Sequence, residues 1–223
     1  MMCLLAICMV LHVDSVAGDE IPRVKSATAL SPRKELWQTV MSPSRRIVVD
    51  GLPNVGKLND HLWRSGQPTR KGLEQLSELL GVKIKTVVNL RQESEVDKTF
   101  LAEINYIPIL MPDEHAPTEA NAQKFLDVVS NPDNWPILVH CKGGQGRTGV
   151  MSAIVRYSFD GWDHKKIMEE MNNFRISHLG LIKTRMAGPQ LAFIENWERT
   201  HTAGEYRDKV QSRTTIIGTS VGL

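Results

Sequence analysis

The sequence predicts an α/β fold in which a central, mostly parallel sheet is flanked by helices. Helical and strand-like patterns alternate between residues 45 and 200, as they do in layered α/β proteins. Residues 86–90 form an apolar run typical of a buried strand, and residues 136–139 form another that ends just before a glycine-rich turn and a helix. The 223 residues are enough for one catalytic domain with a full core.

Each element follows from a local pattern. Pro68-Thr69 is expected to open a helix that Gly81 ends, Thr118 to cap a second helix, and Ser94 to cap a helix that runs to residue 104. Strands are predicted at residues 47–49, 61–64, 86–90, 106–110 and 136–139. Further helices are predicted at residues 147–159, 164–173 and 183–198.

The flanks of the predicted domain have a different composition. Residues 1–13 are apolar and precede the small-x-small sequence Ser15-Val16-Ala17, although no Lys or Arg precedes the apolar core; we interpret residues 1–17 as a signal peptide. Cleavage would send the chain to the periplasm or outside the cell, and without it the chain would stay in the cytoplasm. The stretch is too short for a stable membrane anchor. Residues 18–44 are predicted to be a linker with one helical turn near residues 35–40, 45–200 the catalytic domain, and 201–223 a flexible tail.

Composition excludes several classes of protein. The formal net charge is +2, with 27 basic and 25 acidic residues spread along the chain, which does not favour nucleic-acid binding. Cys3 and Cys8 lie in the apolar start, so no disulfide scaffold is expected. His164 and His178 lack the spacing of metal ligands, and no metal or cofactor is expected. A monomer is expected.

The segment from His140 to Gly149 carries the chemistry. Glycines at positions 143, 144 and 146 let successive backbone N–H groups turn inward, and a helix then begins, so the loop is predicted to bind a phosphate dianion. Arg147 stands six residues after Cys141, where its planar fork would grip two phosphate oxygens. Lys142, Gly143, Gly144, Gln145, Gly146 and Arg147 are therefore the predicted substrate-binding residues.

The same positive surroundings favour a thiolate at Cys141, the form that attacks phosphorus. Thr148 is expected to donate its hydroxyl to the sulfur and ease its departure in a second step. His140 is expected to brace the loop and support the thiolate. The alternative for Cys141, a small apolar filler of the core, is disfavoured by the flanking glycines and by Arg147.

This segment resembles the Cys-x5-Arg-Thr loop of the protein tyrosine phosphatase superfamily, in its dual-specificity branch. The runs Leu62-Trp63-Arg64-Ser65-Gly66-Gln67-Pro68 and Val87-Val88-Asn89-Leu90-Arg91 resemble small bacterial members, and the resemblance covers roughly residues 48–197. It implies a cysteine-phosphatase fold and a general acid on a loop upstream of the cysteine. Asp113 is our choice for that acid, and its neighbours Glu114 and His115 are also titratable. The other interpretation is that Asp113 only caps a turn.

Several alternatives stay open at this stage. Within the upstream run, Arg64 and Ser65 either approach the phosphate, as in similar proteins, or Arg64 is a surface charge with a packed stem. The substrate is a phosphorylated protein, on tyrosine, serine or threonine, or a small ester such as an inositol phosphate; lipid phosphatases carry two lysines where this chain has Lys142 and Gln145. A phosphate-binding pseudophosphatase, a sulfurtransferase and an arsenate reductase are weaker alternatives, the last because no other thiol lies in the domain.

Overall fold

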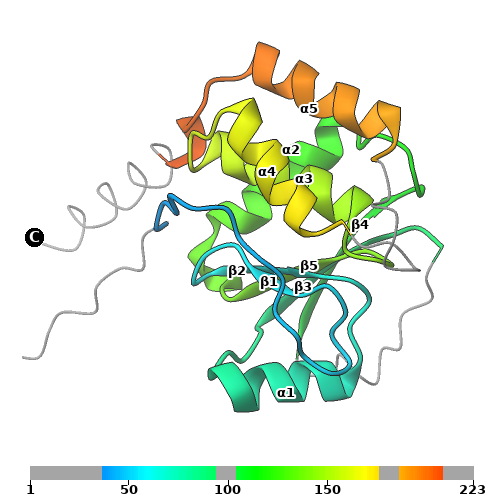
Figure 1. Ribbon diagram of the computed structural model, residues 1–223. Coiled ribbons are helices and arrows are strands. Elements are labelled where there is room, and N and C mark those ends of the chain that lie inside the picture. The colour runs from blue at the N-terminus through cyan, green and yellow to red at the C-terminus, as the bar shows by residue number, and fades with distance from the viewer. Residues whose placement is uncertain (1–36, 94–103, 176–185, 208–223) are drawn as a thin grey trace, which may run out of the picture. The chain divides into compact units, whose positions relative to one another are not determined.

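The computed structural model describes residues 37–93, 104–175 and 186–207, which Figure 1 draws in colour. The predicted signal peptide, most of the predicted linker and the end of the predicted tail lie outside these residues. So does the helix predicted to start at Ser94.

A five-stranded sheet forms the centre of the described residues. Its strands are β1 (Gly56–Lys57), β2 (Leu62–Ser65), β3 (Thr86–Arg91), β4 (Asn105–Met111) and β5 (Ile137–His140), in the spatial order β1-β2-β5-β3-β4. Only β1 pairs antiparallel, with β2; the other neighbours are parallel, which confirms the predicted fold class. The strand predicted at residues 47–49 is reduced to a single bridge between Ile47 and Val55.

Helices cover both faces of the sheet (Figure 1). Helix α1 (Arg70–Leu80) covers one face, and α2 (Glu119–Ser130), α3 (Gly146–Ser158), α4 (His164–Asn173) and α5 (Gly188–Thr200) lie on the other, with a 3₁₀ turn (Pro132–Asn134) between α2 and β5. Strand β5 serves both layers because its side chains alternate: Ile137 and Val139 join the core under the four helices, and Leu138 joins the core under α1.

The predicted helices at Thr69 and Thr118 both begin with a side-chain cap. The Thr69 side chain accepts a hydrogen bond from the backbone of Gly72, and Gly81 ends α1 with a φ of 67°. Thr118 forms a reciprocal capping box with Asn121 at the start of α2. Helix α5 begins at Gly188, after an extended Ala187, and the first predicted residues of this helix, 183–185, lie outside the described residues.

Packed residues extend beyond the 45–200 range expected for the domain. Trp37 is 4% exposed, its ring lies 4.4 Å from that of Phe159, and its Nε1 donates to Asp160 Oδ1 at 2.8 Å. Tyr206, which follows α5 in the chain, is also buried, with its ring 5.7 Å from that of Phe159. Residues 37–40 contain no helical turn. Aromatic side chains, rather than regular structure, attach these flanks to the core.

A buried ionic cluster reinforces the attachment of residues 37–44. Arg156 of α3 pairs with Asp160 at 2.6 Å and with Glu170 of α4 at 2.7 Å. Ser44 joins them, since its backbone N–H donates to Glu170 at 2.8 Å and its hydroxyl accepts from Arg156 at 2.9 Å. Burial opposes the charge on Arg156, but its bonds to Glu170 and Asp160 raise its pKa overall. The cluster thus ties an irregular segment to two helices.

Candidate active site

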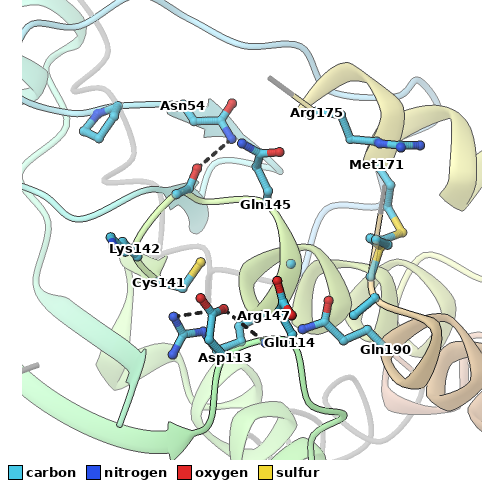
Figure 2. Close-up of a pocket in the computed structure, with 15 residues that line it drawn as sticks. Asn54, Asp113, Glu114, Cys141, Lys142, Gln145, Arg147, Met171, Arg175 and Gln190 are labelled. Atoms are coloured by element: carbon cyan, nitrogen blue, oxygen red, sulfur yellow. Dashed lines mark hydrogen bonds and ion pairs between the residues drawn. The ribbon is translucent and has the colours of Figure 1, made fainter. Parts of the chain in front are cut away.

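The loop between β5 and α3 lies at the carboxyl edge of the sheet. The register places His140 between Ser65 of β2 and Asn89 of β3, at the ends of three parallel strands. Cys141 follows at once and is 3% exposed. It lies at a cavity of about 850 Å³ (Figure 2), which is lined by Pro53, Asn54, Asp113, Glu114, Cys141, Lys142, Gly143, Gln145, Gly146, Arg147, Met171, Arg175, Met186, Ala187 and Gln190.

Three carbonyl groups of this loop are held by donors outside it. Lys142 O accepts from the backbone of Gln67 at 3.0 Å. Gly143 O and Gly144 O accept from Asn54 Nδ2 at 3.1 and 3.0 Å. Because a peptide unit is planar and trans, a carbonyl turned outward turns the next N–H the opposite way. The N–H groups that follow are therefore directed into the loop, as an anion cradle requires.

The start of α3 adds to this cradle. No side chain caps α3, whereas α1, α2 and α4 are capped by Thr69, Thr118 and Asp163. Its first N–H groups and its helix dipole therefore face the loop unblocked. Of the loop glycines, only Gly144 has a positive φ, 68°, so the expected backbone freedom is used at one position. A Cβ there would lie 2.5 Å from Gly66 N.

Arg147 is fully buried and held by carboxylates. Its two terminal nitrogens donate to the two oxygens of Glu93 at 2.7 and 2.9 Å, and Nη1 also donates to Met111 O at 3.1 Å. Hydrogen bonding to Arg147 holds the pKa of Glu93 well below its usual range. Arg147 Nε is buried without a hydrogen-bond partner among the described residues. Glu93 thus fixes the guanidinium, and Nε is the donor that it leaves unbonded.

The loop after β4 brings Asp113 to the same arginine. Asp113 Oδ1 lies 3.2 Å from Arg147 Nη2, and its carboxylate is 63% exposed. Asp113 and Glu114 both line the cavity (Figure 2), and Glu114 adopts a φ of 59°. His115 is tied to this turn through its Nδ1, 2.7 Å from Asp113 O. Gln190 of α5 donates to His115 O at 3.2 Å, which connects this loop to α5.

His140 and Thr148 are buried behind the cradle. Burial, together with the positive charges of Arg91 and Arg147, lowers the pKa of His140 to about 4, although its bond to Cys141 O acts in the other direction. The imidazole is therefore neutral at pH 7, with Nδ1 3.3 Å from Cys141 O. The Thr148 hydroxyl has no hydrogen-bond partner within the described part of the chain. Lys142, by contrast, is exposed at the rim.

Neither alternative for Arg64 matches its position. Its side chain is 1% exposed, so it is not a surface charge, and it is absent from the cavity lining. Its Nη2 donates to Gly144 O at 2.8 Å from behind the loop. Ser65 is also buried, and its hydroxyl donates to Gly66 O at 2.7 Å.

Sequence reasoning did not identify Asn54, Glu93 or Gln190, and it named Gln67 only within the run that resembles small bacterial members. Glu93 had a detectable signal, because it stands two residues beyond the end of a parallel strand, where ligand-binding groups gather. Asn54 follows a proline and adopts a φ of 54°, the kind of turn position that asparagine tolerates. Nothing in the sequence places Gln190, from a helix more than forty residues later, against Gly146.

Two kinds of feature are absent from the described ranges. No group of three or more His, Cys, Asp or Glu side chains there is arranged to hold a metal ion. No helix there is long and apolar enough to cross a membrane.

The sheet order and the loop after β5 define the class of dual-specificity cysteine phosphatases, and comparison with known families agrees. Residues 47–185 match the family described as DSP-PTPase phosphatase fused to NAD+ kinase, and the chain belongs to this family. The superfamily expected from the loop is thereby confirmed.

The chain is similar to proteins named as dual-specificity phosphatases and as NAD kinases. The chain is 28% identical over 150 residues to the dual specificity protein phosphatase TpbA of Pseudomonas aeruginosa UCBPP-PA14, covering 66% of this chain and 62% of that protein. It is 34% identical over 124 residues to NAD kinase 2, chloroplastic, of Arabidopsis thaliana, covering 52% of this chain and 12% of that one. The chain spans about three fifths of the length of the TpbA proteins it matches.

Solved structures share the fold. The catalytic domain of the PP-IP phosphatase SIW14 of S. cerevisiae, solved with citrate, superposes with a TM-score of 0.58 at 24% identity, covering 75% of this chain and 96% of that one. TpbA of P. aeruginosa superposes with a TM-score of 0.56 at 22% identity, covering 76% and 97%.

Proposed function

We propose that this chain is a cysteine-dependent phosphatase that hydrolyses phosphate monoesters through a cysteinyl-phosphate intermediate. The observation that carries the proposal is the position of buried Cys141 in a loop whose carbonyls are drawn outward, beside Arg147. Inward N–H groups, the start of α3 and the Arg147 guanidinium would bind the three non-bridging oxygens of a phosphoryl group. The sulfur would then stand in line with the ester bond.

The reaction has two steps. In the first, Cys141 Sγ as thiolate forms a bond to phosphorus, the bond from phosphorus to the ester oxygen breaks, and protonated Asp113 gives its proton to that oxygen. In the second, water attacks phosphorus, the S–P bond breaks to return the thiolate, and Asp113 accepts the proton of the water. His140 and Thr148 act from behind the loop, where His140 braces Cys141 O and Thr148 offers its hydroxyl to the departing sulfur.

The rim of the cavity bears on the substrate class. Pro53, Met171, Met186 and Ala187 give the cavity an apolar wall, which suits an aromatic ring such as that of phosphotyrosine. The relative TpbA, whose structure has been solved with phosphotyrosine, supports this first candidate. Lys142 at the rim favours an inositol phosphate as the second, and SIW14 is named as a PP-IP phosphatase.

The test is phosphate release by the full chain, with Cys141→Ser beside it and a chelator present, on p-nitrophenyl phosphate, phosphopeptides and inositol phosphates. Activity confined to the wild type supports the covalent mechanism, and activity retained by Cys141→Ser refutes it. The ranking of phosphotyrosine against inositol phosphates decides between the two substrate classes. Binding without turnover in the wild type would favour the pseudophosphatase alternative.

The general acid is tested by a pair of neighbouring variants. Asp113→Asn should slow alkyl phosphates more than aryl phosphates, because only a poor leaving group needs the proton. Glu114→Gln should lower both rates equally or leave them unchanged. The reverse result would assign the acid to Glu114.

We also propose that the chain is exported and acts as a monomer. The apolar stretch before Ser15-Val16-Ala17 supports export. Expression of the full chain with mass measurement of the secreted product should give a new N-terminus after Ala17. An intact N-terminus on cytoplasmic protein would contradict export, and light scattering that gives a dimer mass would contradict the monomer.

A further inference from the structure

Arg64 of β2 is a buried cation directly behind the phosphate loop. Its side chain is 1% exposed, and its guanidinium carbon lies 3.9 Å from the ring centroid of Phe174. Nη2 donates to Gly144 O at 2.8 Å. Nε and Nη1 are buried and have no hydrogen-bond partner among the described residues.

The charge on Arg64 has no carboxylate in contact with it in the described ranges, unlike the other buried arginines. Arg147 is paired with Glu93, and Arg156 with Asp160 and Glu170. Burial lowers the pKa of Arg64 to about 10, while Glu170 and Cys141 act to raise it. The side chain is therefore charged at pH 7. A buried and unpaired charge is unfavourable unless an anion nearby compensates for it.

We propose that Arg64 is a positioning residue whose buried charge stabilises the anionic form of Cys141 and whose bond to Gly144 O keeps that carbonyl out of the cradle. The inference rests on the proposed role of Cys141 as nucleophile. Glu170 favours the charge on Arg64 from a distance. The proposal adds a second compensating anion in the cradle itself, the thiolate when the site is free and the phosphoryl group when it is filled.

Other charged groups face the cradle, but they are balanced differently. On the loop itself, Arg147 contacts two carboxylates, those of Glu93 and Asp113, so its charge is already offset. Arg91 of β3 also pairs with Glu93, with its Nε 3.0 Å from Glu93 Oε1. Lys142 is exposed, and water screens its charge. His140 is neutral. Arg175 also lines the cavity, but it is partly exposed. Among the described residues, Arg64 is thus the buried cation near the cradle whose charge is neither screened by water nor offset by a bonded carboxylate.

The bond to Gly144 gives the charge a defined position. Gly144 O accepts from both Arg64 and Asn54, so the peptide between Gly144 and Gln145 is fixed with its N–H toward the cradle. A glutamine at position 64 would still donate to this carbonyl but would carry no charge. A lysine would keep the charge and lose the planar stacking on Phe174. The two variants therefore separate the electrostatic role from the bracing role.

The experiment measures alkylation of Cys141 by iodoacetamide in the full chain as a function of pH, with the Cys141 peptide followed by mass spectrometry. Arg64→Gln should move the pH midpoint of alkylation upward by about one unit and weaken competition by inorganic phosphate about tenfold. Arg64→Lys should stay within a few tenths of a pH unit of the wild type. Lys142→Gln, which removes an exposed charge next to Cys141, should shift the midpoint less than Arg64→Gln.

A wild-type midpoint in folded Arg64→Gln would overturn the proposal. An equal shift in Arg64→Lys and Arg64→Gln would also overturn it, because the charge would then not be the cause. Arg64→Met keeps contact with Phe174 and replaces the Gln variant if that one does not fold. Alkylation does not require turnover, so this experiment also tests the proposed function separately. If Cys141 is not a nucleophile, it should react in the wild type only at the pH at which an ordinary thiol reacts.

Discussion

The hydrogen bonds of the Asn54 side chain to the phosphate loop give the sharpest test of the loop structure. Its Nδ2 donates to three carbonyls, Gly143 O at 3.1 Å, Gly144 O at 3.0 Å and Phe174 O at 3.0 Å. Its Oδ1 is buried with no hydrogen-bond partner in the described ranges. Asn54→Asp replaces the only bonded group of the side chain by a second acceptor while hardly changing its size.

The expected cost follows from these bonds. Each is worth about 1 kcal/mol net, and the two hydrogens serve three acceptors, so their loss costs about 2–3 kcal/mol. A carboxylate facing three carbonyls at 7% exposure adds repulsion, which brings the total to roughly 3 kcal/mol or more. In a chain of this size that lowers Tm by about 6–12 °C. Aspartate tolerates a φ of 54° as asparagine does, so backbone strain is not the cause.

Asn59 provides the matched control. It is 3% exposed, but its Oδ1 is the bonded atom, accepting from the backbone of His61 at 2.9 Å and of Leu62 at 2.8 Å, while its Nδ2 has no hydrogen-bond partner in the described ranges. Asn59→Asp keeps both bonds and should lower Tm by much less. Thermal unfolding of both variants, with KM for p-nitrophenyl phosphate, is the assay. Equal losses of Tm, or an unchanged KM in Asn54→Asp, would refute the reasoning.

Three further predictions concern the same loop. Gly144→Ala should abolish phosphate binding while Gly143→Ala retains it. A Cβ at position 144 would lie 2.5 Å from Gly66 N, whereas one at position 143 would have no neighbour nearer than 3.8 Å. Isothermal titration with phosphate distinguishes the two variants, and equal binding would contradict the structure. Glu93→Gln should reduce kcat/KM about tenfold without unfolding the protein, because it removes the carboxylate that orients Arg147. The loss is limited to this size because that carboxylate is half exposed and water partly screens its bonds. An unchanged kcat/KM would show that Glu93 has no role in the site. His140 takes up a proton below pH 6.5 in the unfolded chain but only near pH 4 in the folded chain, so its stabilising contribution is present above pH 6.5 and is lost as the pH falls toward 4. His140→Asn should therefore flatten the dependence of Tm on pH between these values. A Tm curve parallel to that of the wild type would contradict the prediction.

The sequence predicted those parts of the site that are local in the chain. The segment from His140 to Gly149 contains its own turn and helix start, so Cys141 and Arg147 could be proposed from their spacing, and the structure places both at the cavity. The cap at Thr118 and the helix start at Thr69 were found for the same reason, because a cap bonds to residues three positions later.

The groups that hold the loop could not be found in this way. Asn54 reaches carbonyls about ninety positions away, and Glu93 reaches an arginine 54 positions away. Such pairs depend on the order of strands in the sheet, which periodicity does not reveal. The same limit applies to Trp37, whose partner Asp160 lies 123 positions along the chain and whose surroundings have no apolar period.

The anchoring of Ser44 connects the edge of the domain to the cavity. The Ser44 N–H donates to Glu170, which lies on α4 one residue before Met171. The chain continues from α4 to Arg175, and Met171 and Arg175 both line the cavity. Asn173 on the same helix donates to Ser44 O at 2.9 Å. A chain shortened to begin at Arg45 would keep every residue of the loop and still lose the outer support of that wall. For this fold, the smallest catalytic fragment is therefore larger than the stretch that contains its chemistry.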